Sequence, residues 1–145
     1  MKYENQIELK FSAKSENESF ARSVIACYAL KLKPNVAQIS DVKTAVSEAV
    51  TNAVVHGYPQ GEGDILMQVG IEAGNLHIKV IDYGVGIDDV NIALEPFYTT
   101  KPEEERSGMG ITIMKSFMDE VKVTSQKNDG TTVYMLKKIA SDNSL

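Results

Sequence analysis

The chain has 145 residues, of which 43% are hydrophobic and 24% are charged. This composition is typical of one globular domain with a core of its own, and it excludes a disordered chain. The 20 acidic residues outnumber the 15 basic ones and give a net charge of −5, which disfavours partners such as nucleic acid or an anionic membrane.

Cysteine content and hydropathy narrow the class of protein further. The only cysteine, Cys27, excludes an internal disulfide and a cysteine-cluster metal site. No apolar run approaches the roughly 18 residues of a membrane span, and the first ten residues lack the apolar segment of a signal peptide. We therefore expect a cytoplasmic protein in which residues 1–145 form a single domain.

The first half of the chain predicts one strand and two helices. Alternating apolar residues predict a strand over 6–12, and the S-x-x-E pattern from Ser15 to Glu18 predicts a capping box. The helix that follows, to about residue 32, is expected to pack through Phe20, Val24, Cys27 and Tyr28. A 3.6-residue apolar period predicts a second helix over 36–56, with Gly57 at its C′ position.

The second half predicts two strand pairs, a long loop and a short helix. Alternating segments at 65–71 and 76–82 predict an antiparallel hairpin. The segment 82–109 is expected to be a functional or mobile loop with a helical piece at 90–94. A helix over 110–118 and strands at 120–125 and 131–137 complete an α+β fold. We expect a two-layer α/β sandwich with a mixed, mostly antiparallel sheet and helices on one face.

The second helix carries a polar stripe along the margin of its apolar face. Glu48, Asn52 and His56 follow one another at i, i+4 and i+8. The carboxylate can take a proton, and the carboxamide oxygen can bind a hard cation such as Mg²⁺ without adding charge. A solvated helix edge would show the same spacing.

The end of the 76–82 strand carries an inward-facing carboxylate. Asp82 shares the parity of the apolar residues of its strand, so it should need hydrogen-bond donors in the core. The protein can supply these donors, or a ligand can, such as the exocyclic amino group of adenine. Gly84 and Gly86 would let the backbone approach a flat ring closely.

The start of the third helix is a candidate phosphate site. Its small residues expose backbone N–H groups at the positive end of the helix dipole: Ser107, Gly108, Met109 and Gly110. An ordinary loop-to-helix turn is the alternative. In the loop before it, a lid over phosphates or a plain solvated loop could be formed by Thr99, Thr100 and Lys101. The hydroxyl of Thr131 should face inward, toward a base edge or a partner in the core.

The order of these motifs resembles a known superfamily. Glu48 with Asn52, the D-x-G-x-G run from Asp82, the G-x-G run ending at Gly110 and Gly130-Thr131 resemble the N, G1, G2 and G3 boxes of the GHKL ATPases and kinases. The segments 15–22, 46–58, 99–110 and 130–134 look like its sporulation anti-sigma F branch, which consists of serine-protein kinases of spore-forming bacteria.

This resemblance implies a cofactor, ATP with Mg²⁺ and with ADP as product, and a set of roles. It makes Glu48 the general base, Asn52 the Mg²⁺ ligand and Asp82 the adenine acceptor with Thr131 nearby. It implies nucleotide contacts for His56, Gly84, Gly86, the lid residues Thr99, Thr100 and Lys101, and the helix start Ser107, Gly108, Met109 and Gly110.

The resemblance also implies partners. It predicts a homodimer that inhibits sigma factor F and phosphorylates an anti-anti-sigma factor on serine, with Arg22 in the partner surface. Two alternatives stay open: a general-stress anti-sigma kinase of the same branch, and a nucleotide-gated partner-switching module without kinase activity.

Overall fold

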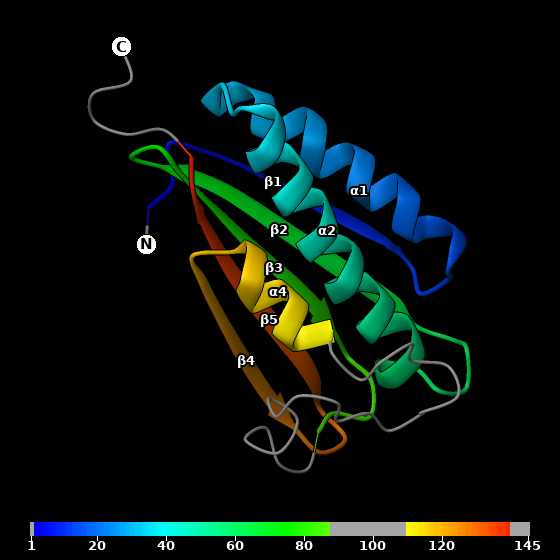
Figure 1. Ribbon diagram of the computed structural model, residues 1–145. Coiled ribbons are helices and arrows are strands. Elements are labelled where there is room, and N and C mark those ends of the chain that lie inside the picture. Colours follow the sequence, from blue (N-terminus) through cyan, green and yellow to red (C-terminus); the bar gives the residue numbers. More distant parts are fainter. Residues whose placement is uncertain (1, 88–109, 140–145) are drawn as a thin grey trace.

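The computed structural model describes residues 2–87 and 110–139, which form one sheet with helices on one of its faces (Figure 1). The expected helix at 90–94 lies outside the described residues, as do Thr99, Thr100, Lys101, Ser107, Gly108 and Met109. The described elements are β1 (Asn5–Ser12), α1 (Glu16–Ala29), η1 (Leu30–Leu32), α2 (Val36–Asn52), η2 (Ala53–Gly57), β2 (Asp64–Glu72), β3 (Asn75–Asp82), α4 (Gly110–Phe117), β4 (Glu120–Gln126) and β5 (Gly130–Lys138).

The sheet has the strand order β1-β2-β3-β5-β4, and every pairing is antiparallel. α1, α2 and α4 cover one face of it (Figure 1). The predicted α+β sandwich is thereby confirmed. The turn between β2 and β3 is tight because Ala73 and Gly74 both have positive φ, 51° and 80°, as a type I′ turn requires.

The core lies between the sheet and the helices. Ile65, Met67 and Val69 alternate along β2 and are almost completely buried, and from α2 Val42 and Val46 meet this face. Full burial of such a side chain stabilises the fold by about 1.5–3 kcal/mol. The period-2 and period-3.6 patterns of the sequence therefore reflect the two layers of one core.

α1 buries a face shifted by one residue from the predicted one. Its buried residues are Ala21, Ile25, Tyr28 and Ala29, whereas Phe20 is 54% exposed and Cys27 is exposed. The prediction that α1 packs through Phe20 and Cys27 is wrong. Two of the buried residues are alanines, and apolar periodicity alone does not distinguish a small buried residue from a large exposed one.

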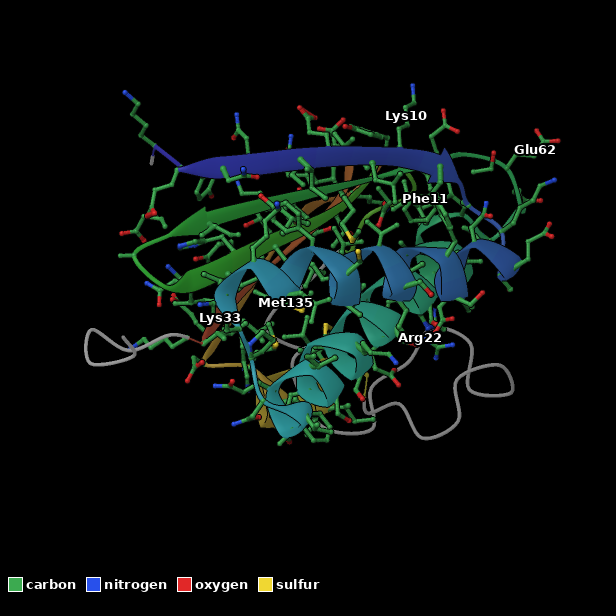
Figure 2. The ribbon with its side chains drawn as sticks, turned by 90° about the horizontal axis from the view of Figure 1, so that it is seen from above. Lys10, Phe11, Arg22, Lys33, Glu62 and Met135 are labelled. Carbon is green, nitrogen blue, oxygen red and sulfur yellow. The ribbon has the colours of Figure 1, made fainter. Side chains whose placement is uncertain are left out.

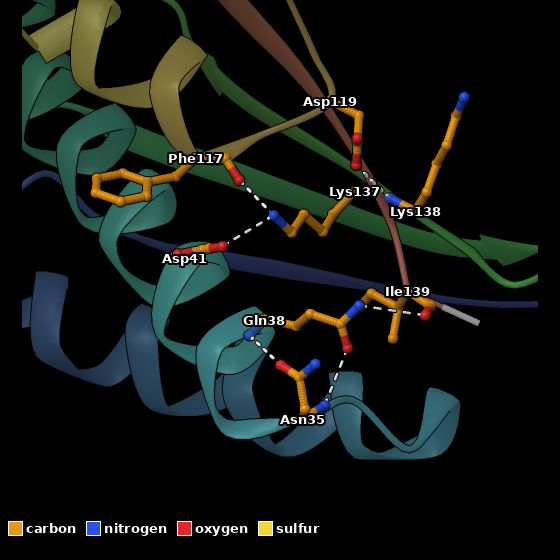
Figure 3. A network of polar contacts seen from close by, with 8 residues as sticks. All are labelled: Asn35, Gln38, Asp41, Phe117, Asp119, Lys137, Lys138 and Ile139. Atoms are coloured by element: carbon orange, nitrogen blue, oxygen red, sulfur yellow. Dashed lines mark hydrogen bonds and ion pairs between the residues drawn. The ribbon is translucent and has the colours of Figure 1, made fainter. Parts of the chain in front are cut away.

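The predicted capping box at Ser15 is wrong, because Ser15 makes no side-chain cap bond. Instead, the Glu18 carboxylate accepts the hydroxyl of Ser47 in α2. A capping box is found at α2. There the Asn35 side chain accepts the Gln38 N–H at 2.7 Å, and the Gln38 side chain accepts the Asn35 N–H at 2.9 Å (Figure 3).

Polar contacts tie α2 and α4 to the end of β5 (Figure 3). The Lys137 ammonium donates to Asp41 Oδ2 of α2 at 3.0 Å and to the Phe117 carbonyl of α4 at 2.6 Å. Gln38 Nε2 also donates to the Ile139 carbonyl at 3.3 Å. These contacts fix the helix layer to the sheet at the end of the molecule where α2 begins.

Both ends of the described chain lie beside the β2–β3 turn. The Ile139 N–H donates to the Gly74 carbonyl at 3.1 Å. The Glu4 carboxylate accepts the Ala73 N–H at 2.7 Å, and the Glu4 N–H donates to the Ile71 carbonyl at 2.9 Å. The first and last strands therefore converge on this turn, at the end of β3 away from Asp82.

His77 of β3 is only 4% exposed, although its strand parity places it opposite the apolar residues of β3. It lies on the sheet face away from the helices, where the Tyr3 ring lies 5.3 Å away between centroids. Its Nδ1 is 2.7 Å from the Tyr134 hydroxyl and its Nε2 is 3.3 Å from Glu72 Oε1.

Among the described residues, no helix is long and apolar enough to cross a membrane.

Candidate functional site

The candidate site begins at the C-terminal end of α2. Glu48 and Asn52 lie one helical turn apart in α2 and are both half-buried. The regular α-helix was predicted over 36–56, but it ends at Asn52, and residues Ala53–Gly57 form a π-helix. A π-helix bonds i to i+5, so the regular α spacing expected for the stripe holds for Glu48 and Asn52 and does not continue to His56. Such turns are frequent at functional sites.

Gly57 joins this helix end to the carboxylate of Asp82. A Cβ on Gly57 would lie 2.7 Å from Asp82 Cγ and 2.8 Å from its Oδ2, so no side chain fits there. The Gly57 carbonyl accepts the Val85 N–H at 2.9 Å, and a Cβ on Gly84 would lie 1.8 Å from that carbonyl oxygen. The predicted C′ role of Gly57 is wrong: the glycine is required by this close approach and not by a positive φ.

Asp82 is 5% exposed and points into the core, as the strand parity predicts. Its Oδ1 accepts the Gly84 N–H at 3.0 Å. Burial raises the pKa of the Asp82 carboxyl, while the backbone N–H groups of Gly84 and Thr131 lower it. A carboxylate with this burial is held in place by backbone donors from both adjacent segments.

Tyr58 was not predicted as a site residue. Its hydroxyl donates to the Asp64 carbonyl at 2.6 Å and accepts the Tyr83 N–H at 2.7 Å. Burial raises the pKa of Tyr58, and the nearby Asp82 carboxylate acts in the same direction. These contacts link segments that are distant in sequence, so periodicity gives no signal for them.

The β4–β5 hairpin supports the turn after Asp82 from the other side. The Asn128 N–H donates to the Val85 carbonyl at 2.6 Å, and the Ile87 N–H donates to the Ser125 hydroxyl at 2.8 Å. Gly86 has φ +73°, and a Cβ there would lie 2.0 Å from the Gln126 carbonyl oxygen. Ser125 is another residue that the sequence did not indicate.

The structure thus brings most of the described candidates together. Thr131 lies opposite Asp82 in the β3–β5 register, next to the Gly84–Gly86 turn and Gly57. Gly110 is buried at the start of α4, which packs against α2. Arg22 lies on α1 (Figure 2). It pairs with Glu18 Oε1 at 3.4 Å, and the same oxygen accepts the Ser47 hydroxyl of α2.

The described part of the chain contains no group of three or more His, Cys, Asp or Glu side chains that could hold a metal ion by themselves. A cation at Asn52 would therefore need further ligands from outside these side chains, such as phosphate oxygens and water.

Comparison with known proteins identifies the family. The model of the histidine kinase-like ATPase domain matches residues 11–137. The chain belongs to this family of ATPase domains. The predicted GHKL membership is thereby confirmed, and membership of this ATPase domain family implies an ATP-binding site.

Relatives of this ATPase domain cover nearly the whole chain. One from Clostridium acetobutylicum, named anti-sigma F factor, is 54% identical over 94% of this chain and 96% of its own length. Another with the same name, from Geobacillus thermodenitrificans, is 52% identical over 97% of both chains. A third, from Thermoanaerobacter sp. strain X514, is 51% identical over 98% of this chain and 99% of its own.

Solved structures share the fold of this ATPase domain. The RsbU and RsbW domains of a Mycobacterium tuberculosis protein superpose with a TM-score of 0.67 at 18% identity, over 94% of this chain and 34% of that one. The catalytic domain of the histidine kinase ThkA gives a TM-score of 0.60 at 17% identity, over 92% of this chain and 97% of that one.

Proposed function

We propose that this chain is an anti-sigma factor and serine-protein kinase. It binds and inhibits the sporulation sigma factor F and uses ATP to phosphorylate an anti-anti-sigma factor on serine. The observation that carries the proposal is the buried Asp82 carboxylate packed on Gly57, just beyond the α2 end that bears Glu48 and Asn52. The shared name of the relatives favours sigma factor F over a general-stress sigma factor.

Asp82 is the adenine acceptor in this proposal. Its carboxylate is buried and fixed by the Gly84 N–H, so it can accept a hydrogen from the exocyclic amino group with little reorganisation. Thr131 stands opposite it in the sheet, and the Gly84–Gly86 turn that follows Asp82 is packed against the Gly57 and Gln126 carbonyls. A 6-oxo purine presents an acceptor to this carboxylate and is rejected.

Asn52 is the proposed Mg²⁺ ligand. A side-chain carbonyl oxygen suits this hard cation, which in nucleotide sites takes one or two protein oxygens and completes its shell with phosphates and water. The absence of a metal cage among the described side chains fits such a shared site. Bound Mg²⁺ neutralises phosphate charge, and His56 lies in the same region of the helix end.

Glu48 is the proposed general base, and its one chemical role is to accept a proton. Phosphoryl transfer depends mainly on positioning and charge neutralisation. The Glu48 carboxylate, one turn before Asn52, would accept the proton of the substrate serine hydroxyl. The serine oxygen bonds to the γ-phosphorus of ATP while the bond from that phosphorus to the β,γ-bridging oxygen breaks, and ADP leaves. In the same proposal the segments 99–101 and 107–110 supply the lid and the phosphate-binding N–H groups.

A labelled-phosphate experiment tests the kinase assignment. With radiolabelled ATP, Mg²⁺ and an anti-anti-sigma factor, label should appear on serine of that partner and not on this chain. We expect Glu48→Ala to reduce transfer by about 10²- to 10⁴-fold, because the general base is gone, while ATP binding by calorimetry is kept.

Glu16→Ala is the matched control, since it removes an exposed carboxylate from α1. A near-native transfer rate in Glu48→Ala would contradict the base assignment. If the intact chain bound ATP but labelled no partner, the nucleotide-gated module without kinase activity would be the better description.

A further inference from the structure

A row of polar side chains crosses the sheet at the end that carries Asp82. Asp82 of β3 pairs with Thr131 of β5, and Thr131 pairs with Ser125 of β4. Directly paired residues of antiparallel strands point to the same face, with Cβ atoms about 4.5–5.5 Å apart. The function proposed above uses the first two members of the row and leaves Ser125 without a role.

The Ser125 hydroxyl makes three hydrogen-bond contacts, which is as many as a hydroxyl group can make. Its hydroxyl oxygen accepts the Ile87 N–H at 2.8 Å, its hydrogen goes to the Gly130 carbonyl at 3.0 Å, and it lies 2.7 Å from the Thr131 hydroxyl. A serine hydroxyl has one hydrogen and two lone pairs. Either hydroxyl can donate in the contact between them. With the Ser125 hydrogen on the Gly130 carbonyl, which can only accept, Thr131 is the donor.

The polarity of Thr131 follows from this count. Its hydroxyl hydrogen points to Ser125, so the lone pairs of Thr131 Oγ1 are what the hydroxyl can offer to any other neighbour. The part of the proposed nucleotide site formed by Asp82 and Thr131 therefore presents acceptors. An exocyclic amino group, which carries two hydrogens and no acceptor, fits such a wall, whereas a ring carbonyl does not.

We propose that Ser125 is a positioning residue of the nucleotide site. It fixes the Thr131 hydroxyl as an acceptor beside Asp82 and holds the 84–87 turn through the Ile87 N–H, which adds to the preference for a 6-amino over a 6-oxo purine. The inference rests on the proposed function, since it takes Asp82 as the adenine acceptor. Ser125 acts through Thr131 and the turn and need not touch the nucleotide.

The test compares dissociation constants for ATP and inosine triphosphate, whose base is a 6-oxo purine, on the full chain. In Ser125→Ala the Thr131 hydroxyl is free to turn and donate. We expect the selectivity for ATP over inosine triphosphate to fall about threefold to tenfold, the equivalent of one hydrogen bond. Ser125→Thr keeps a hydroxyl at the position and should restore the wild-type ratio.

Two further variants separate positioning from folding. Thr124→Ala, a neighbour in β4 that is exposed on the opposite face, should leave the ratio unchanged. Thr131→Val removes the hydroxyl at nearly constant shape, and in that background Ser125→Ala should not change the ratio again. This comparison within one background holds even if each variant lowers the thermal midpoint.

The outcomes distinguish this inference from the proposed function. Loss of selectivity in Ser125→Ala, rescue by Ser125→Thr and no further effect in the Thr131→Val background support it. An unchanged ratio in Ser125→Ala, or an equal change in both backgrounds, overturns it while leaving the nucleotide site standing. If the unmodified chain fails to bind ATP, the proposed function itself is wrong.

Discussion

At the scale of single residues, the side chain that lowers the stability of the fold is also the one proposed to bind the base. Asp82 is buried at 5% exposure, and burial raises its pKa, so keeping the ionised form in the fold at neutral pH reduces stability. Gly57 makes room for it, because any Cβ would meet the carboxylate. Because the buried Asp82 carboxylate reduces the stability of the fold, its position is explained by ligand binding and not by folding.

Asp82→Asn should therefore improve stability and impair binding. The folded-state pKa lies above the unfolded value of 3.8, so the native state binds more protons and stability falls as pH rises through that interval. Asparagine lacks this titration. We expect its urea midpoint to exceed that of the wild type above the interval and the difference to vanish below it.

Although Asp82→Asn should be more stable, its affinity for ATP should be lower. Loss of a charged acceptor should weaken ATP binding about 10- to 100-fold, as calorimetry would report. Asp129→Asn, which changes an exposed carboxylate in the β4–β5 turn, is the control for charge. A lower midpoint for Asp82→Asn at neutral pH would argue against a destabilising buried charge.

At the scale of elements, α2 connects two parts of the molecule with different tasks. Its start is fixed by the Asn35–Gln38 capping box and by the Gln38 contact with the end of β5. Its end leaves α geometry at Ala53, where the π-helix presents Gly57 and Tyr58 to the turn after β3. The helix is thus anchored to the sheet at one end and shaped for the site at the other.

Tyr58→Phe tests whether the contacts just after the C-terminal end of α2 support the proposed nucleotide site. The change leaves the Tyr83 N–H and the Asp64 carbonyl without their hydroxyl partner, which should cost about 1–3 kcal/mol in urea unfolding. Because the Tyr83 N–H lies next to Asp82, we also expect weaker ATP binding by calorimetry.

Tyr28→Phe is the matched control for Tyr58→Phe. Its hydroxyl donates to the Asn5 side chain between α1 and β1, away from the site. It should lose stability and keep its ATP affinity. Equal ATP affinities in the two variants would show that Tyr58 supports the fold and not the nucleotide turn.

At the scale of the whole molecule, periodicity explains how much could be predicted. The strands and the antiparallel order followed from alternation along β2 and β3, and the motif order pointed to the family. Contacts between distant segments could not be read in this way. The Tyr58 hydroxyl and Ser125 act through backbone groups, and the burial of His77 depends on the ring of Tyr3, which lies before β1.

The π-helix and the packing face of α1 escaped prediction for a related reason. One extra residue in a helical turn has no compositional signature, so the apolar pattern continues through Ala53 and Val54 as if the helix were regular. On α1, Ala21 is fully buried while Phe20 is 54% exposed, and apolar periodicity does not predict which of the two faces the core.

The proposed partner surface belongs to this scale too, because Arg22 lies on α1 and the Asp82 row lies in the sheet. Arg22→Glu places two carboxylates one helical turn apart, since Glu18 is its present partner, and reverses the charge of the surface. We expect it to reduce capture of the sigma factor in a pull-down at least tenfold while ATP binding is kept.

Lys33→Glu makes the same charge reversal just beyond the other end of α1 and η1 and should leave capture unchanged (Figure 2). Undiminished capture by Arg22→Glu would count against this surface. The oligomeric state should be measured alongside, because a change in the homodimer expected from the sequence would also alter capture.

The convergence of Glu4 and Ile139 on the β2–β3 turn has a practical consequence for experiments. That turn is separated from Asp82 by the length of β3, about 24 Å for its eight residues. A fluorophore or a surface tether attached beside Glu4 or Ile139 is thus at the end of β3 opposite Asp82. Binding can be followed on immobilised protein without the attachment occupying the site.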